Sequence, residues 1–320
     1  MKRKTKVIYA MLPVLLGASL LCALGMGSVK LDIGALLRGE ETESVILLSL
    51  RLPRVLGAAL AGAALAPAGL ILQAATGNDL AAPNVVGVNT GAGLGVMMIL
   101  CLWPGKWALL PLAAFCGALA AAGIVLFLSA GKSRSTVLLA GVAVSAMGNA
   151  VISFLSLRFP DALVSYTGFT AGGFSGVRWR ELPIPASVIF LALIAGWLLL
   201  PRLERLSLGD EAAYGLGIRV KLVRALSLVT ASALCASAVS YAGLLGFVGL
   251  MVPHILRKLG FGGGRRALFP NFLAGATLTV LADLGGRVLF APTELPAGIL
   301  TAAIGAPFFL WLLIRGRDRT

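Results

Sequence analysis

The chain has 320 residues, of which 58% are hydrophobic and only 12% are charged. A soluble domain is about 45–50% apolar and about 25% charged, so this composition excludes an ordinary soluble globular protein and indicates an integral membrane protein. The formal net charge is +14. In a soluble protein such an excess would suggest nucleic-acid binding. In a membrane protein the positive-inside rule accounts for it, and no nucleic-acid partner is expected.

Apolar stretches of transmembrane length follow one another along the whole chain. A bilayer-spanning helix needs about 20 apolar residues, and segments without the alternation of barrel strands span as helices. The stretch 222–256 is about twice that length and has Gly243, Gly246 and Gly249 near its middle, so it is divided into two helices. The predicted fold is an all-α integral membrane protein with about ten transmembrane helices, in a single membrane domain over 1–320. The predicted spans are 7–27, 52–75, 85–103, 107–130, 137–157, 184–200, 222–256 (two helices), 267–291 and 295–314.

The distribution of basic residues predicts the orientation. With the N-terminus in the cytoplasm, eighteen of the 27 Lys and Arg residues fall in cytoplasmic gaps and tails. This asymmetry predicts that both termini are cytoplasmic. The basic start followed by an apolar run also resembles a signal peptide, but the run is long for one and no A-x-A site ends it, so we expect a retained first helix. The nine outer basic residues are Lys30, Arg38, Arg51, Arg54, Lys106, Arg158, Arg178, Arg180 and Arg287.

Glycines mark two places where helices pack closely or the backbone is irregular. In the span 85–103, Gly87, Gly91 and Gly95 recur at every fourth residue, a spacing that lets another helix approach, and Asn89 adds a polar group. The outer gap 158–183 contains Gly168, Gly172, Gly173 and Gly176, which argue against a plain helix through it. A partly re-entrant or pore-lining segment and a flexible loop both fit this gap.

Several residues that carry chemistry elsewhere are better explained as structural. Gly131-Lys132-Ser133 resembles the end of a P-loop, but Leu126 stands where its first glycine belongs, so no nucleotide site is predicted. Asp283 lies inside an apolar run with Arg287 one turn later, which favours a structural ion pair over a proton relay. His254 is the sole histidine and suits helix-end packing, so neither a metal site nor a catalytic residue is expected.

The polar gap between residues 202 and 224 is more elaborate than a turn. Asp210 and Glu211 follow Gly209 and place acidic residues at a helix start. Ala212, Ala213 and Tyr214 can continue the helix, and Gly215 or Gly217 would end it. The sequence therefore predicts a short cytoplasmic helix that contacts another protein. An ordinary loop whose charges face water is the alternative.

Five segments carry a family resemblance. They are RLPR at 51–54, AGAALAPAGLILQAATGNDLAAPNVVGVNTGAG at 61–93, LGDEAAYGLGI at 208–218, GFVGLMVPHILR at 246–257 and LADLGGRVLFAPTELPAGILTAAIGAPFFLWLL at 281–313. Together they resemble the FecCD-type permease subunits of bacterial ATP-binding-cassette importers for iron–siderophores, haem and vitamin B12, which have a type II importer fold. One departure is Asn78-Asp79-Leu80-Ala81, where the family usually has Asn-Pro-Leu-Ala. Aspartate can also start a turn.

The resemblance implies partners and roles. It implies a bacterial inner-membrane subunit without its own ATPase site or cofactor, which pairs with an identical or different permease. Two cytoplasmic ATP-binding subunits and an extracytoplasmic solute-binding protein complete the importer. The expected cargo is an iron–siderophore chelate, with haem or cobalamin as alternatives. An ion-coupled secondary transporter is disfavoured because Asp283 is its only candidate coupling residue.

The resemblance also implies site residues on three surfaces. The ATPase contact falls in the segment 205–218, on Gly209, Asp210, Glu211, Ala212, Tyr214, Gly215 and Gly217. Docking of the binding protein falls on Arg51, Arg54 and Arg287. Helix packing or the transport pathway involves Gly87, Asn89, Gly91, Gly95, Gly172 and Gly173.

Overall fold

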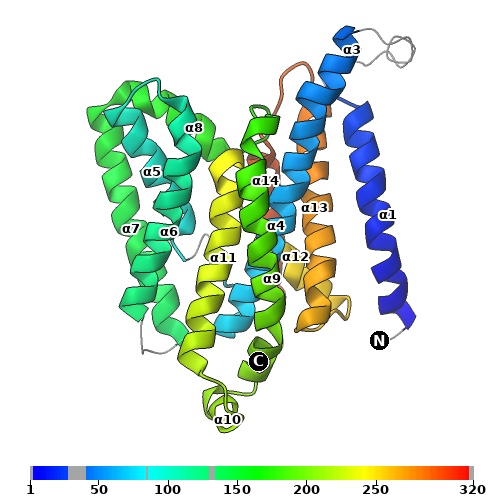
Figure 1. Cartoon of the computed structure of the whole chain (residues 1–320), viewed down its shortest axis with the longest axis vertical. Helices are drawn as coiled ribbons and strands as arrows, with labels where there is room; N and C mark the ends of the chain where they lie inside the picture. The colour runs from blue at the N-terminus through cyan, green and yellow to red at the C-terminus, as the bar shows by residue number, and fades with distance from the viewer. Residues whose placement is uncertain (1–2, 28–40, 84–85, 130–133, 317–320) are drawn as a thin grey trace.

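The computed structural model describes residues 3–27, 41–83, 86–129 and 134–316. Within these ranges the chain is a bundle of helices without β-strands (Figure 1). The helices are α1 Arg3–Gly25, α3 Glu41–Val45, η1 Ile46–Arg51, α4 Leu52–Thr76, α5 Val88–Leu102, η2 Trp107–Leu109, α6 Leu110–Ser129, α7 Arg134–Arg158, α8 Pro160–Ala171, η3 Trp179–Glu181, α9 Pro183–Leu206, α10 Asp210–Gly215, α11 Val220–Ala242, α12 Val248–Lys258, α13 Arg265–Val288 and α14 Ala297–Gly316.

Seven of the described helical segments are long and apolar enough to cross a membrane, judged by length and composition. The three other predicted spans are occupied by the shorter helices α5, α12 and α14. The predicted division of 222–256 is confirmed, because α11 ends at Ala242 and α12 begins at Val248. With 11 residues, α12 is only about 16 Å long and covers about half of a 30 Å hydrocarbon core.

Helix α4 forms the centre of the bundle. It contacts α9, α11, α12 and α13. In its most apolar stretch 83% of the residues are buried, against 17% in that of the peripheral α1. Small residues allow this crowding. A Cβ atom on Gly62 would overlap the carbonyl oxygen of Gly275 in α13, and one on Gly69 would overlap that of Gly249 in α12. These helices therefore meet backbone to backbone, the close approach that membrane helices achieve with glycine.

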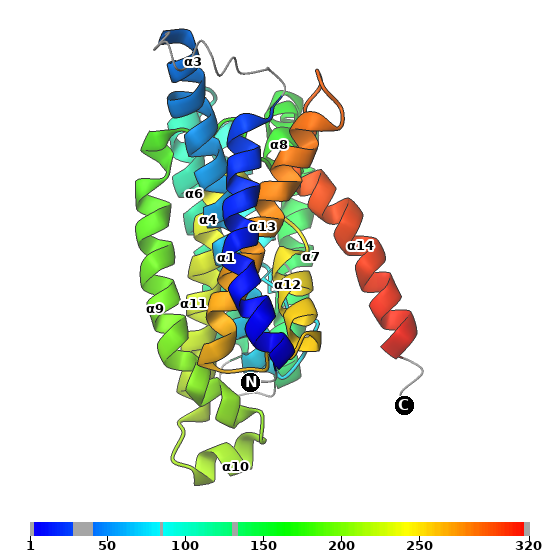
Figure 2. The ribbon, with the colours of Figure 1, turned by 90° about the vertical axis from the view of Figure 1, so that its right-hand side faces the viewer.

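The remaining helices surround this centre on different sides of the bundle. Helices α5, α6, α7 and α8 form a group on one side of α11 (Figure 1). Helix α14 diverges from the bundle toward its free end, and Ile304 and Leu310 are exposed along it (Figure 2). The start of α1, the end of α14 and the small helix α10 all lie at one end of the molecule, and α3 lies at the other.

The gap 158–183 contains a helix that was not predicted, although no helix runs through the whole gap. Its first part is the regular helix α8, which contains Gly168. Pro160 at the first helical position favours this start, because its fixed φ suits a helix and its missing N–H is not needed there. The helix ends at Gly172, whose φ of +61° suits glycine. The segment is irregular only from Gly172 to Arg178, before η3.

Candidate functional site

A cluster of buried charges joins α4, α13 and the segment between α13 and α14. Two Arg54 nitrogens, Nη2 and Nε, lie 2.9 and 3.1 Å from Asp283 Oδ1, and Nη1 donates to Glu294 Oε2 at 2.7 Å. Arg287 Nε lies 3.1 Å from Asp283 Oδ2, which confirms the predicted ion pair one turn apart. The Asp283 side chain is 3% exposed, that of Arg54 14% and that of Glu294 29%. Asp283 is thus held between two arginines, and Glu294 is the most accessible member.

Arg51 and Arg287 also bind the end of α1. Arg51 donates through Nη1 to the carbonyl oxygens of Leu24 and Gly25, at 2.9 and 3.1 Å. Arg287 donates to those of Ala23 and Met26, at 3.0 and 3.2 Å. The last carbonyls of a helix have no partner within it and carry partial negative charge, so cations stabilise them. Residues far apart in sequence thereby fix the first helix to the bundle.

This arrangement corrects the predicted exposure of the docking arginines. The structure brings Arg51, Arg54 and Arg287 together where α4 begins and α13 ends. Arg51 is 6% exposed and Arg287 2% exposed, and both donate within the chain, so neither offers a free surface charge in this conformation. Arg54 alone lines a cavity. A docking role for the three residues stays a prediction.

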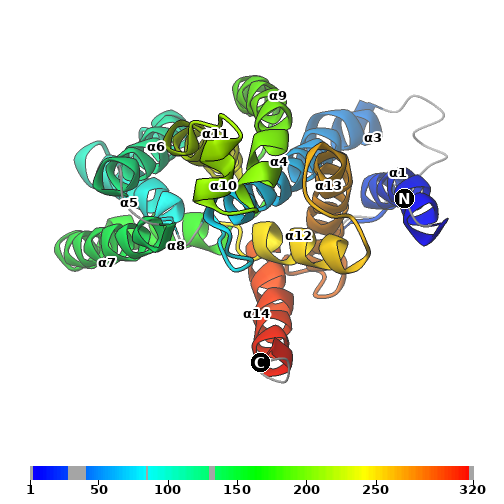
Figure 3. The same ribbon diagram turned by 90° about the horizontal axis from the view of Figure 1, so that it is seen from below.

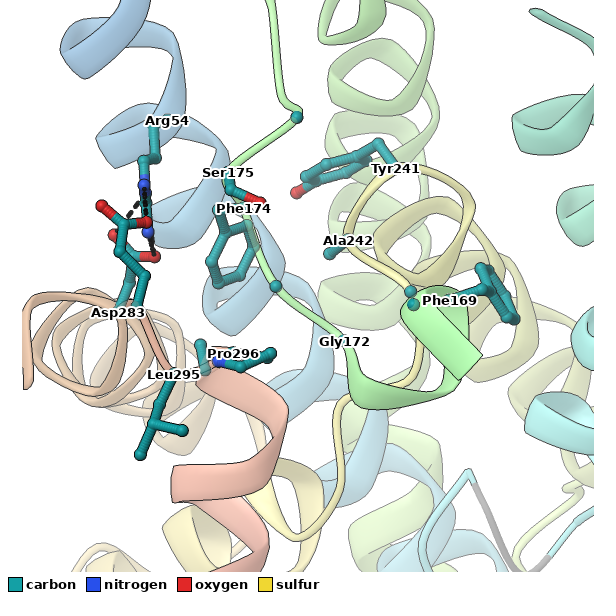
Figure 4. Close-up of a pocket in the computed structure, with 16 residues that line it drawn as sticks. Arg54, Phe169, Gly172, Phe174, Ser175, Tyr241, Ala242, Asp283, Leu295 and Pro296 are labelled. Atoms are coloured by element: carbon teal, nitrogen blue, oxygen red, sulfur yellow. Dashed lines mark hydrogen bonds and ion pairs between the residues drawn. The ribbon is translucent and has the colours of Figure 1, made fainter. Parts of the chain in front are cut away.

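The cavity lies where three irregular segments meet (Figure 4). It has a volume of about 260 Å³, with Arg54 and Asp283 on one side and Phe169 and Tyr241 on the other. The Tyr241 hydroxyl donates to the carbonyl of Gly57 at 2.9 Å. The lining therefore combines the buried charges with the backbone of the three segments.

Gly172 and Gly173 hold the three segments together through backbone hydrogen bonds. Gly173 N donates to Ala242 O at 2.7 Å, and Gly298 N donates to Gly172 O at 2.9 Å. Leu244 N donates to Phe169 O at 3.1 Å. A Cβ atom on Gly172 would overlap the carbonyl of Leu244, so this junction requires glycine. The ends of α8 and α11 and the start of α14 are thus connected at the cavity.

The predicted glycine packing in the third span is confirmed for Gly91 and Gly95. Cβ atoms on Gly91 and Gly95 would overlap the backbone carbonyls of Gly117 and Ala113, so α5 and α6 lie in direct backbone contact. Gly87 precedes the helix with a φ of +86°. Asn89 faces α11, where the Cys235 thiol lies 3.6 Å from its side-chain oxygen.

The predicted short helix in the 202–224 gap is confirmed as α10, Asp210–Gly215. Arg224 Nη2 pairs with the carboxylate of Asp210 at 3.0 Å, and the buried Ala213 fixes the inner face. Ile218 N donates to Ala213 O, and Gly217 N donates to Tyr214 O with a φ of +78° at Gly217. This pair of bonds is a Schellman cap. The cap and the ion pair make α10 a defined element rather than a loose loop.

The outer face of α10 carries exposed apolar side chains. Tyr214 is 77% exposed, and Leu208 and Leu216 beside the helix are also exposed. Figure 3, seen from below, shows α10 across the ends of α9 and α11. Adjacent exposed apolar side chains on a rigid projection are typical of a contact surface for another protein.

A polar group at the α10 end of the bundle was not predicted. Arg257 donates to Gln73 Oε1 at 2.7 Å and forms an ion pair with Asp79. The turn begins with Asn78, whose side chain accepts from Leu80 N at 2.9 Å. Asp79, which departs from the family's proline, therefore connects this turn to α12. The departure from the family motif was the only sequence signal for this contact.

The segment Gly131-Lys132-Ser133, which resembles the end of a P-loop, lies outside the described residues.

The long apolar helices define the class of protein: a multi-pass integral membrane protein. The comparisons identify its family. Residues 15–315 match the FecCD transport family, and the chain belongs to it.

Named relatives and a solved structure agree with this membership. The chain is 36% identical to the Fe(3+)-citrate import system permease protein YfmE of Bacillus subtilis over 98% of this chain and 96% of that protein. It is 41% identical to the achromobactin transport system permease protein CbrC of Dickeya dadantii over 98% of this chain and 92% of that protein. A structure described as a metal-chelate type ABC transporter in an inward-facing conformation superposes with a TM-score of 0.88 at 29% identity, over 97% and 99% of the two chains. The chain is thus a multi-pass permease of an ABC importer family, whose members work with separate ATPase and substrate-binding partners.

Proposed function

We propose that this chain lines the translocation pathway of an ATP-driven importer for an iron–siderophore-type chelate. The observation that carries the coupling part of this proposal is α10. It is fixed to α11 by the Arg224–Asp210 pair, ends in a Schellman cap and presents Tyr214 outward. Such a rigid projection can pass a rigid-body movement of an ATPase subunit to the membrane helices, as coupling between two sites requires. In this proposal the residues from Gly209 to Gly217 form the ATPase contact, and both termini lie on the same cytoplasmic side.

The coupling proposal is tested by placing charge on the exposed face of α10. In a reconstituted complex, Tyr214→Asp with Leu216→Asp should remove substrate-stimulated ATP hydrolysis and reduce co-purification of the ATPase subunit. The matched control is Leu289→Asp with Phe290→Asp, two exposed residues at the opposite end of the molecule. Normal stimulated hydrolysis in the α10 variant would contradict the proposal, as would an equal loss in the control.

The cargo proposal rests on the family and on relatives named for Fe(3+)-citrate import and achromobactin transport. An iron chelate is bulky and is delivered by a binding protein, so the permease itself needs little cargo specificity. The test is uptake of radioactive iron with a series of chelators, together with ligand titration of the binding protein encoded beside this chain. Uptake of haem or cobalamin without uptake of any ferric chelate would refute the cargo assignment.

We further propose how the binding protein engages the outer end. Arg54 has two acidic partners, and Glu294 is the accessible one. A carboxylate of the binding protein would replace Glu294 at Arg54 and leave the buried Asp283 pair in place. Such pairs orient a partner and speed its association more than they raise affinity.

The replacement makes opposite predictions for two variants. Arg54→Gln should weaken capture of the binding protein, whereas Glu294→Gln should strengthen it because the internal competitor is gone. Glu181→Gln, in η3 at the same end, is the matched control and should leave capture unchanged. Weaker capture by Glu294→Gln would show that Glu294 is not displaced.

A further inference from the structure

An open groove on the outside of the bundle combines aromatic walls with two arginines at one end. Helix α13 forms its floor, and α1 and α9 form its sides (Figure 3). Its volume is about 900 Å³, the largest of the hollows described here. The walls are Tyr9 from α1, Phe190 and Trp197 from α9, and Phe269 and Phe272 from α13. The groove lies on a different side of the bundle from α14 and does not include the cavity at Arg54.

The arginines lie at the end of the groove nearest α10 and the chain termini. Arg265 begins α13, its guanidinium lies 4.0 Å from the centre of the Trp197 ring, and its Nε donates to the Trp197 carbonyl at 3.2 Å. Arg266 follows it, and both residues are exposed. Among the described residues, neither arginine forms an ion pair, and the nearby Glu204 lies against Gly264. Two positive charges are therefore held beside the groove without a carboxylate partner within the described chain.

The groove extends over about two thirds of the hydrocarbon depth of one membrane leaflet. Phe190 and Trp197 are seven residues apart on α9, and Arg265 and Phe272 are seven apart on α13. Seven residues of helix span about 10 Å, which is about two thirds of the roughly 15 Å depth of one leaflet's hydrocarbon. A lipid whose phosphate lay at the arginines would have its acyl chains beside the aromatic rings.

We propose that this groove binds an anionic glycerophospholipid of the cytoplasmic leaflet. The headgroup phosphate pairs with Arg265 and Arg266, and an acyl chain lies along Trp197, Ile194 and Phe190. Cation pairs between membrane helices on the cytoplasmic side favour anionic headgroups, and arginine matches phosphate geometry with two parallel donors. The Trp197 contact positions the Arg265 guanidinium and leaves its outer edge available. The bound lipid would connect α1 and α9, which pack little against each other within the described residues.

The test counts lipids bound to the purified full-length chain by native mass spectrometry. The chain is titrated with phosphatidylglycerol, with phosphatidylcholine of the same acyl chains, and with glycerol phosphate as a headgroup without chains. Each arginine near an anionic lipid contributes about a fivefold preference. We expect one site that prefers phosphatidylglycerol about 30-fold and no binding of glycerol phosphate.

Two variants and a control separate the headgroup from the groove. Arg265→Gln with Arg266→Gln should reduce phosphatidylglycerol binding to the phosphatidylcholine level. Ile194→Trp should fill the groove and reduce binding of both lipids at unchanged charge. Arg202→Gln with Arg205→Gln removes two exposed charges at the same end of α9 and should leave the site intact. Equal affinity for the two lipids, binding of glycerol phosphate alone, or a phosphatidylglycerol preference that survives the Arg265 and Arg266 changes would overturn the proposal. So would an unaffected Ile194→Trp variant or an equal loss in the control.

Discussion

Removing the carboxylate of Asp283 should strongly destabilise the bundle. The side chain is 3% exposed and lies within 3.1 Å of nitrogens of both Arg54 and Arg287. Asp283→Asn would leave the guanidinium groups of Arg54 and Arg287 without this carboxylate, and Glu294, which pairs with Arg54, is more accessible to solvent. Breaking a buried ion pair by removing one partner costs about 3–5 kcal/mol. That is a large share of the roughly 5–15 kcal/mol by which proteins are stable.

Two other carboxylates serve as matched comparisons for this magnitude. Glu294 is 29% exposed and Asp210 is 47% exposed, and each forms an ion pair with an arginine. More accessible pairs contribute about 0–1 kcal/mol, so Glu294→Gln and Asp210→Asn should each cost about 1 kcal/mol or less. The order of destabilisation should therefore be Asp283 well above Glu294 and Asp210.

The assay is titration of the detergent-solubilised chain with sodium dodecyl sulfate, followed by far-UV circular dichroism. The double variant Asp283→Asn with Arg287→Gln should lose less stability than the sum of the two single variants, because the residues are directly coupled. An Asp283→Asn variant within about 1 kcal/mol of the wild type, or no more affected than Asp210→Asn, would refute the reasoning from burial.

Three further predictions concern packing, the coupling helix and orientation. Gly62→Ala places a methyl group on a facing carbonyl of α13 and should cost about 1–3 kcal/mol in the same titration, whereas Gly17→Ala, with no atom near the new methyl, should cost nothing measurable. Gly217→Ala forces an L-residue into a φ of +78° and should destabilise the cap of α10 by about 1–2 kcal/mol, seen as faster hydrogen exchange in that helix with unchanged exchange in α4. Leu216→Cys should be protected from a membrane-impermeant thiol reagent in intact cells and Leu289→Cys should react, in variants without the native cysteines; the reverse pattern would invert the proposed orientation.

Local sequence patterns predict most of the helices and the close packing of α5. Segment length and uniform apolarity locate the membrane helices, because the bilayer forces each backbone group to be satisfied within its own segment. The local glycine signals were equally informative: Gly243 marks the break between α11 and α12, Gly217 ends α10, and Gly91 and Gly95 line the α5 contact. Each of these features depends on a few neighbouring residues, so a local pattern predicts it. The helix α8 was not predicted, because glycines argue against a helix, yet α8 accommodates Gly168 and ends just before Gly172.

The contacts of Arg51 and Arg54, and those of Arg287 with α1, depend on how the bundle packs and follow from no local pattern. Basic residues at helix ends predict exposed positive charges. Arg51 and Arg287 instead donate to carbonyl oxygens at the end of α1. Arg51 is 27 residues from Leu24 along the chain, and Arg287 is 264 residues from Ala23. The ion pair between Asp79 and Arg257 also joins residues far apart in the sequence. The groove is likewise lined by three helices, α1, α9 and α13, that are distant along the chain. Sequence reports the charge of a side chain, but its partner is set by which helix ends the packed bundle brings together. A buried guanidinium needs hydrogen-bond acceptors, and the last carbonyls of a helix are acceptors that lack a donor within the helix.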